Sequence, residues 1–274
     1  MGKTVFILLD GCGDKLAREH MGYLEHMAES QMAARYTVLG QLPSISRPIY
    51  ETLLTGLPAC EHGIVNNMTV RLTLCENIFG LCKQYGLTTA AAAYEWISEL
   101  YNNAPFSSLT DRFQSRTEAA IQNGIFYFSD DYPDSHTLSD GEYLRKMYDP
   151  DFLMIHTMAI DAMGHRFGGG GKEQAEAAVI VDAAISLLLP TWLEQGYNVL
   201  ITADHGMGAD GWHGGNTDEQ RMVPLYLFAD KARNGVLGEM VSQLAVAPLL
   251  CALLGIKPDD RMLSFAGYGV KFFA

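Results

Sequence analysis

The stretch DFLMIHTMAIDAMGHRFGGGGKEQAEAAVIVDAAISLLLPTWLEQGYNVLITAD, residues 151–204, decides the fold class. Its two ends, 151–161 and 197–204, are continuous apolar runs of strand length, and residues 172–189 between them carry a long helical pattern that Pro190 ends. A strand that is apolar without alternation is buried on both faces, which is typical of parallel sheets covered by helices. The stretch therefore predicts a strand–helix–strand unit of an α/β protein.

The same alternation continues on both sides of this unit. Strand patterns cover residues 4–10, 87–94 and 222–230, and helix patterns cover residues 23–32, 47–57, 76–86 and 239–254. Residues 97–150 are less regular, and we expect helical pieces and loops there. The whole pattern predicts a single domain over residues 1–274, built as a doubly wound, mostly parallel sheet with helices on both faces.

Composition and charge narrow the possible partners. The 274 residues carry 32 acidic and 19 basic side chains, a formal net charge of −13, and no Lys/Arg cluster that could follow a phosphate backbone, so we expect no nucleic-acid polymer as partner. The N-terminal stretch lacks the features of a signal peptide, and the late apolar stretch 244–256 contains a proline and is too short to span a bilayer, so we expect no membrane. The five cysteines form no CxxC pair, which favours reduced thiols and a cytoplasmic protein. The oligomeric state stays open.

Carboxylates and imidazoles gather where the predicted strands end. Asp10, Asp161 and Asp204 each end a strand pattern, and His205 follows Asp204 directly. Because ligand sites of parallel sheets lie beyond the carboxyl ends of the strands, we expect these side chains to meet. His165 lies four residues after Asp161, and His213 lies eight residues after His205. Carboxylates gathered so closely repel one another unless divalent cations offset their charge. A set of aspartate and histidine donors suits zinc or manganese.

Each of these residues also has an ordinary structural alternative. A single aspartate at a strand end is most often a turn or capping residue, and a lone histidine is most often a satisfied core or surface group. We assign that ordinary role to the other histidines, His20, His26, His62, His136 and His156. The repeated combination of a strand end, an aspartate and a histidine favours a metal site for the rest.

A nucleophile is available just before a predicted helix. The segment QLPSISRPIYETLLTGL, residues 41–57, places Ser44 and Ser46 ahead of the helix that Pro48 starts. A helix N-terminus presents free N–H groups that suit a phosphoryl group, and Ser46 is the nearer serine. From the residues alone, a capping role for either serine stays open.

The segments FILLDG, LPSISRPIYETLLTGLPACEHGIVNN, IDAMGHRFG, ITADHGM and GWHGG together resemble the alkaline phosphatase superfamily. The stretch from Pro43 to Asn67 is most similar to the type I phosphodiesterase/nucleotide pyrophosphatase branch. The resemblance runs from residue 4 to about residue 230, in the same order.

The resemblance implies a complete site. One metal ion would be held by Asp161, His165 and His213, and the other by Asp10, Asp204 and His205, with Ser46 in contact as the nucleophile. Asn67 would donate a hydrogen bond to a phosphoryl oxygen. The implied activity is two-metal-dependent hydrolysis of a small-molecule phosphoric ester through a covalent phosphoserine, as in a phosphodiesterase or pyrophosphatase. The implied cofactors are two divalent ions, zinc or alternatively manganese.

Departures from the branch pattern leave alternatives open. Diesterases of this branch more often carry threonine followed by an aromatic residue, whereas this chain has Ser46 and Arg47. Arg47 could bind the extra charge of a phosphate monoester, or it could point to solvent. A phosphomonoesterase, a phosphomutase or phosphonate hydrolase, and a non-catalytic phospho-ligand-binding protein are therefore kept as alternatives. The short chain implies no large cap domain, so residues 97–150 would cover the leaving group, with 126–134 as a substrate wall or an ordinary mixed loop.

Overall fold

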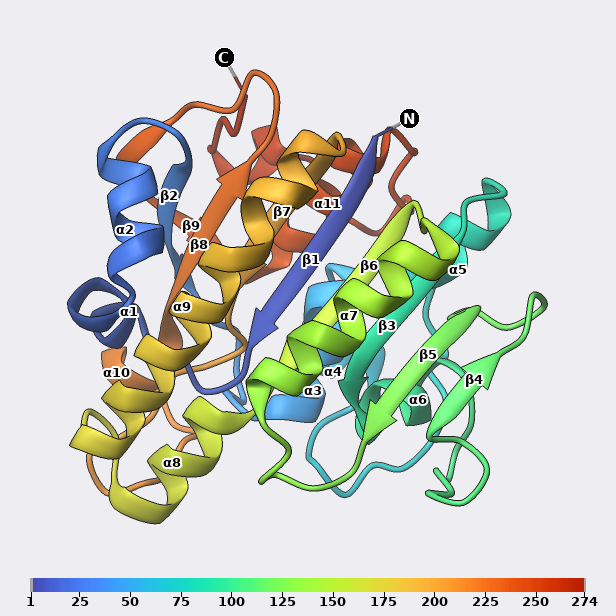
Figure 1. Ribbon diagram of the computed structural model, residues 1–274, viewed down its shortest axis with the longest axis horizontal. Helices are drawn as coiled ribbons and strands as arrows, with labels where there is room; N and C mark the ends of the chain where they lie inside the picture. Colours follow the sequence, from blue (N-terminus) through green and yellow to red (C-terminus); the bar gives the residue numbers. More distant parts are fainter. Residues whose placement is uncertain (1, 274) are drawn as a thin grey trace.

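The computed structural model describes residues 2–273, with the side chain of Ala266 excepted, and centres on one nine-stranded sheet (Figure 1). Its strand order is β4-β5-β3-β6-β1-β7-β8-β2-β9. The strands are β1 (Lys3–Leu9), β2 (Ala34–Leu39), β3 (Thr89–Tyr94), β4 (Phe113–Ser115), β5 (Asn123–Tyr127), β6 (Phe152–Thr157), β7 (Tyr197–Thr202), β8 (Met222–Phe228) and β9 (Gly235–Ser242). The pairs β1/β6, β1/β7, β3/β5, β3/β6 and β2/β9 are parallel, and β8 and β4 make the antiparallel pairs. The prediction of a mostly parallel sheet is confirmed.

Helices cover both faces of this sheet (Figure 1). One face carries α1 (Asp14–His20), α2 (Gly22–Glu29), α7 (Asp134–Tyr148), α8 (Ala159–Phe167) and α9 (Lys172–Glu194). The other face carries α3 (Ser46–Thr55), α4 (Ala59–His62), α5 (Ile78–Gln84), α6 (Glu95–Tyr101) and α11 (Val246–Leu254). The remaining elements are short: α10 (Asp218–Arg221), η1 (Gln243–Ala245) and η2 (Phe265–Tyr268). The doubly wound arrangement is the predicted one.

The central strands explain why the sequence folds this way. Residues 5–9 of β1 and all of β6 are buried, because helices cover both faces of the sheet there. β1 lies between β6 and β7 and is parallel to both, so the carboxyl ends of all three strands lie at the same edge. That edge positions the candidate site.

Some predicted boundaries were wrong. The strand predicted over 151–161 ends at Thr157, and Asp161 lies in the first turn of α8. α9 continues through Pro190 to Glu194, because Trp192 in its last turn is fully buried and donates a hydrogen bond to Glu142. Residues 239–254 are not one helix but the end of β9, the turn η1 and α11. The irregular segment 97–150 also forms two strands, β4 and β5, besides α7.

By length and composition alone, α9 is apolar enough to cross a membrane. In the structure it lies along the sheet and contacts α1, α2, α7, α8 and β7. Its Asp182 is buried and accepts hydrogen bonds from the backbone N–H groups of Tyr23 and Leu24. Its Val181, Ile185 and Leu189 are buried in the core, whereas Val179, Ile180 and Leu187 are exposed, so packing accounts for only part of the apolar character of α9.

Candidate active site

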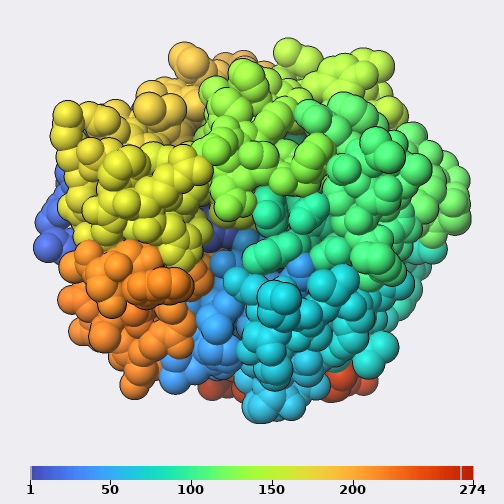
Figure 2. All heavy atoms as spheres, turned by 90° about the horizontal axis from the view of Figure 1, so that it is seen from below, coloured from blue at the N-terminus to red at the C-terminus, as the bar shows by residue number. Residues whose placement is uncertain are grey.

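The predicted site residues meet at the carboxyl edge of the central strands. Figure 2 views the molecule from that side and shows a hollow between the yellow, orange, light-blue and green segments, with dark-blue atoms of the N-terminal segment at its floor. The loops that follow β1 and β7, the start of α8, the start of α3 and the segment around residue 213 all contribute to this region. Segments far apart in the chain therefore build one site.

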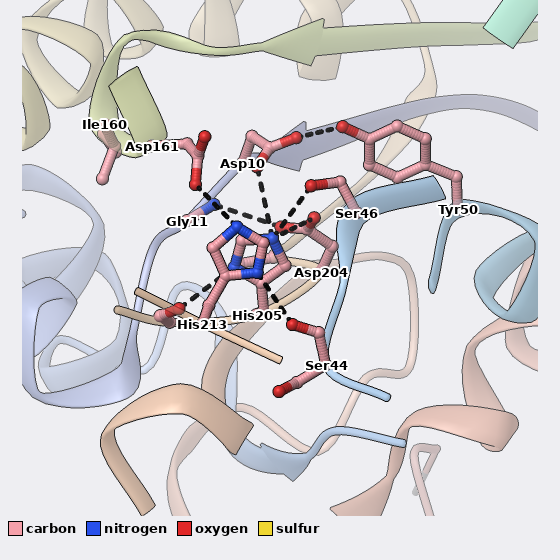
Figure 3. Close-up of polar contacts among 12 residues, drawn as sticks. Asp10, Gly11, Ser44, Ser46, Tyr50, Ile160, Asp161, Asp204, His205 and His213 are labelled. Atoms are coloured by element: carbon pink, nitrogen blue, oxygen red, sulfur yellow. Dashed lines mark hydrogen bonds and ion pairs between the residues drawn. The ribbon is translucent and has the colours of Figure 1, made fainter. Parts of the chain in front are cut away.

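The inner group consists of Asp10, Asp204 and His205 (Figure 3). The Nε2 atom of His205 lies 3.1 Å from Asp204 Oδ2 and 3.6 Å from Asp10 Oδ1. All three side chains are shielded from solvent. Gly11 supports this geometry, since its N–H donates to Asp204 Oδ1 over 3.1 Å. Gly11 also has a φ of +71°, and a Cβ there would lie 2.7 Å from the Cα of Asp161, so only glycine fits.

The outer group consists of Asp161, His165 and His213. The Nε2 atom of His165 lies 3.3 Å from Asp161 Oδ2 and 3.2 Å from His213 Nε2, and His213 Nε2 lies 3.7 Å from Asp161 Oδ1. The four-residue spacing of Asp161 and His165 is helical, so both point from one face of α8. The ring of His213 stacks on that of His205 at 3.7 Å between centroids, which joins the two groups. His205 can therefore also share a cation with Asp161 and His213.

Backbone carbonyls fix the tautomers of the three histidines. The Nδ1 atoms of His165, His205 and His213 contact the carbonyl oxygens of Gly211, Gly206 and Ser44 at 2.8, 3.0 and 2.9 Å. A carbonyl only accepts, so each Nδ1 carries the proton and each Nε2 presents its lone pair to the site. This arrangement is the usual support of metal-ligating histidines.

The candidate nucleophile Ser46 begins α3, next to the inner group. Its Oγ lies 3.1 Å from the Nε2 atom of His205, and the residue is buried. Because that Nε2 is unprotonated, the Ser46 hydroxyl donates the hydrogen bond. Ser44 has a different role, since its Oγ accepts from the N–H of Gly214 and donates to the carbonyl of Gly215, which fixes the loop that carries His213.

Asn67 and Arg47 lie beside Ser46. The Oδ1 atom of Asn67 accepts the backbone N–H of Arg47 over 3.0 Å, which leaves the Asn67 amide group free to donate. The Arg47 side chain is 1% exposed and does not point to solvent. Its terminal nitrogens bind Glu99 Oε2 at 2.7 Å and the carbonyl of Thr69 at 3.2 Å, and its guanidinium lies 4.6 Å above the ring of Trp96.

Comparison with known proteins identifies the family. Residues 4–211 match the type I phosphodiesterase / nucleotide pyrophosphatase family. The chain belongs to this family. It thereby belongs to the alkaline phosphatase superfamily, as the sequence motifs predicted.

Relatives of this family member include enzymes of two kinds. It is 28% identical over 155 residues to the catalytic subunit of GPI ethanolamine phosphate transferase 3 of Mus musculus, a match that covers 53% of this chain and 14% of the relative. It is 24% identical over 237 residues to ectonucleotide pyrophosphatase/phosphodiesterase family member 7 of Homo sapiens, covering 76% and 48%. The chain thus spans less than half the length of these relatives.

The fold of this family member matches solved structures over nearly all of the chain. Murine ectonucleotide pyrophosphatase/phosphodiesterase 5 superposes with a TM-score of 0.76 at 13% sequence identity, covering 97% of this chain and 98% of that one. An inactive variant of the same murine protein has been solved in complex with AMP and superposes equally well.

The family is generally two-metal dependent, and the side chains of this member fit two cations. Asp10 Oδ1, Asp161 Oδ1 and Asp204 Oδ2 are buried oxygens without a hydrogen-bond partner among the described residues. Burial, with the charge of Asp161 added, raises the pKa of Asp204 to about 8. Burial likewise raises the pKa of Asp10 and of Asp161 and lowers that of His213 to about 3. Bound divalent cations would accept the lone pairs of these unpartnered oxygens and unprotonated Nε2 atoms. Their positive charge would also offset the repulsion between the carboxylates.

Two further residues contact the site, and the sequence singled out neither of them as part of it. Tyr50 donates its hydroxyl proton to Asp10 Oδ2, and the Nε2 atom of His156 lies 3.0 Å from the same oxygen. Tyr50 lies on the predicted helix, four residues after Ser46. This helical spacing could have indicated that Tyr50 points to the same region as Ser46. The sequence favours an ordinary structural role for His156. Its contact with Asp10 could not be foreseen, because that contact depends on the pairing of β6 with β1. The ordinary role of His62 agrees with its contacts to Thr52 and the N–H of Ile64.

The segment 97–150 reaches the site through α7. Asp134, at the start of α7, accepts the N–H groups of Met158 and Ala159 at 3.0 and 3.1 Å and so fixes the start of α8. Asp131 pairs with Arg166 of α8 at 2.6 Å. The segment therefore supports the helix that carries Asp161, and its role in covering the leaving group stays a prediction.

The buried pair of Arg47 and Glu99 leads to a stability prediction. Replacing Glu99 by leucine leaves the Arg47 charge buried without its partner, and we expect the free energy of unfolding to fall by about 3–5 kcal/mol. Urea unfolding of Glu99→Leu against wild type measures this loss. The double variant Arg47→Met/Glu99→Leu removes both charges and should recover most of it. A single variant as stable as wild type would contradict the role given to this pair.

Proposed function

We propose that this protein hydrolyses small-molecule phosphoric diesters through a covalent phosphoserine formed on Ser46. The observation that carries the proposal is the position of Ser46 at the start of α3, with its Oγ 3.1 Å from His205 and beside both ligand groups. A nucleophile, a helix N-terminus and a buried set of ligand side chains thus meet at one point. This combination suits transfer of a phosphoryl group.

The residues that would hold the cations follow from the site geometry. Asp10, Asp204 and His205 would hold one ion, and Asp161, His165 and His213 would hold the other, with His205 able to contribute to either. When bound, two divalent cations supply positive charge that lowers the pKa of an adjacent hydroxyl and stabilises the charge of the phosphoryl oxygens. Zinc suits this mixture of imidazole and carboxylate donors, and manganese is the alternative.

The side chains of this protein carry the two chemical steps. Ser46 Oγ, having lost its proton to solvent, forms a bond to phosphorus while the bond from phosphorus to the leaving oxygen breaks, and the leaving alkoxide takes up a proton. Asn67 donates its amide protons to a phosphoryl oxygen and stabilises the charge there. In this phosphoserine the second ester group of the diester stays on phosphorus. Water then attacks phosphorus, the bond between phosphorus and Ser46 Oγ breaks, the hydroxyl is restored, and a phosphate monoester is released.

The placement of Arg47 favours diesters over monoesters. A monoester carries one more negative charge than a diester and gains most from a free guanidinium next to the nucleophile. The charge of Arg47 is already paired with Glu99, one of its terminal nitrogens also binds the carbonyl of Thr69, and Trp96 covers the group, although the buried Nε has no partner among the described residues. The similarity to a murine relative solved in complex with AMP supports a nucleotide-like diester or pyrophosphate as substrate.

Transfer to an alcohol is the second candidate. The similarity to GPI ethanolamine phosphate transferases supports it, and the same phosphoserine would serve if an alcohol replaced water in the second step. Product analysis in water enriched in oxygen-18 separates the two. Hydrolysis places the label in the released phosphoryl product, whereas transfer to an added alcohol leaves that product unlabelled.

Rates on bis-p-nitrophenyl phosphate and p-nitrophenyl phosphate test the proposed preference. We expect the chelated protein to be inactive and zinc or manganese to restore turnover. We also expect kcat/KM to be at least about 10-fold higher for the diester, which corresponds to about 1.4 kcal/mol of additional transition-state binding. A preference for the monoester would contradict the diesterase proposal and direct attention to Arg47.

A further inference from the structure

Asp10 stands out among the site carboxylates, because two side chains donate to the same one of its oxygens. We infer that Tyr50 and His156 are positioning residues, which hold the Asp10 carboxylate so that its second oxygen faces the cation, and that Tyr50 ties this ligand to the helix of the nucleophile. The inference rests on the proposed function only in taking Asp10 as a cation ligand.

The two oxygens of Asp10 have separate surroundings. Oδ2 accepts the hydroxyl proton of Tyr50 and lies 3.0 Å from His156 Nε2 (Figure 3 shows the Tyr50 contact). Within residues 2–273, Oδ1 finds no hydrogen-bond partner, and it lies 3.6 Å from the Nε2 atom of His205. One oxygen is thus fixed by protein donors while the other is left for a cation.

The tautomer of His156 suits this role. Its Nδ1 atom lies 3.4 Å from the backbone N–H of Tyr94, which donates to it. Nδ1 is therefore an acceptor, and the ring proton of the neutral imidazole is on Nε2, where it donates to Asp10. This is the reverse of the tautomer of His165, His205 and His213, whose Nε2 atoms present a lone pair. His156 is thus built to support a ligand, not to be one.

Tyr50 connects Asp10 to Ser46. The two residues lie four positions apart on α3, so they share one face of the helix. The Tyr50 ring packs against His156, with 4.7 Å between centroids and an angle of 68° between the planes. Both donors are fully buried, so their hydrogen bonds do not compete with water. A shift of α3 that displaced Ser46 would also move a donor of Asp10.

Cation affinity, measured by calorimetric titration of Zn²⁺ and of Mn²⁺ into the chelated protein, tests this inference without turnover. Loss of a side chain that orients a ligand typically costs about 10–100-fold in metal affinity. In Tyr50→Phe we expect one of the two binding steps to weaken by that factor, while the step assigned to Asp161, His165 and His213 changes by less than about 3-fold.

Tyr101→Phe is the matched control. Tyr101 is also a buried tyrosine, and it donates over 2.8 Å to a buried carboxylate of α3, that of Glu51, which is no candidate ligand. We expect both binding steps of this variant to stay at wild-type strength. If Tyr50→Phe does not fold, as circular dichroism would show, the pair His156→Leu and His156→Gln serves instead. Leucine removes the donor and should weaken the same step, and glutamine, which keeps an N–H, should restore part of it.

Three results would overturn the inference. Unchanged affinities in Tyr50→Phe and His156→Leu would show that the donors do not orient Asp10. Equal weakening of both steps, or the same weakening in Tyr101→Phe, would show a general loosening of the core. A wild type that binds no cation would end both the inference and the proposed function, whereas a wild type that binds two cations without hydrolysing diesters would end the proposed function alone.

Discussion

Ser46→Ala is expected to lower diester hydrolysis by about 10³-fold or more while the protein still binds two divalent cations. The hydroxyl is the group that forms the bond to phosphorus, and the residues that follow it on α3, Arg47, Pro48 and Ile49, carry no nucleophile that could replace it. The cations, by contrast, would be held by aspartate and histidine side chains that this change does not touch. The variant should therefore lose turnover but keep its metal content.

Steady-state rates and metal content by elemental analysis check this expectation, with Ser44→Ala as the matched control. Ser44 lies two residues away, and its hydroxyl bonds only backbone groups of Gly214 and Gly215. Because Ser44→Ala loosens the loop of His213 but leaves the nucleophile in place, we expect it to lose far less turnover than Ser46→Ala. Mass spectrometry of wild type acid-quenched during turnover of bis-p-nitrophenyl phosphate should find a p-nitrophenyl phosphoryl group on the peptide with Ser46. Near-wild-type rates in Ser46→Ala would refute the assignment of the nucleophile.

Asp204→Asn is expected to lower both cation occupancy and turnover. Asp204 is fully buried and lies 3.1 Å from His205 Nε2. Gly11 binds one of its oxygens, and the other has no partner in the part of the chain that the structure describes. An amide cannot supply the negative charge that this second oxygen offers a cation. A cation at about 100 times its Kd stabilises a folded protein by about 2.7 kcal/mol. Much of that stabilisation should be missing in the variant.

The rise in Tm on adding zinc or manganese to chelated protein measures this loss, and elemental analysis gives the occupancy. Asp182→Asn is the matched control, since Asp182 is also buried, with its pKa raised by burial, yet bonds only backbone N–H groups in α2. We expect the control to lose some stability but to keep the full metal-dependent rise in Tm. The same rise in Asp204→Asn as in wild type would show that Asp204 holds no cation.

The sequence predicted for a local reason that the site aspartates and histidines gather at one edge of the sheet, whereas their division into two groups was implied by the family resemblance. Asp10 and Asp204 follow buried apolar strands, and parallel strands bring their carboxyl ends to one edge whatever the details of pairing. The strand predicted over residues 151–161 was too long, but the position of His165 beside Asp161 was still predicted correctly. The four-residue spacing of the two residues is itself typical of a helix. Features that depend on a strand end or a short spacing are therefore accessible from the residues alone.

Features that depend on contacts between distant segments were not predicted. The role of His156 depends on the register that pairs it with Leu8 and brings it to Asp10. Strand β2 was missed because its Arg35 interrupts the apolar pattern. That side chain is nevertheless buried, because Asp14 and Glu25 pair with it at 2.7 and 3.1 Å. Neither partner could be chosen from the sequence before the fold was known.

The central place of β1 also sets an order of events during synthesis. β1 is the first of these strands to be made, but its two neighbours are β6 and β7, so it has no partner until β6 has been translated to Thr157 and is flanked on both sides only after Thr202. At about 5–20 residues per second, the wait from Leu9 to Thr157 lasts roughly 7–30 s. For this time the apolar strand that precedes Asp10 has no partner strand, so a nascent chain of this protein should depend on chaperones that bind exposed apolar segments.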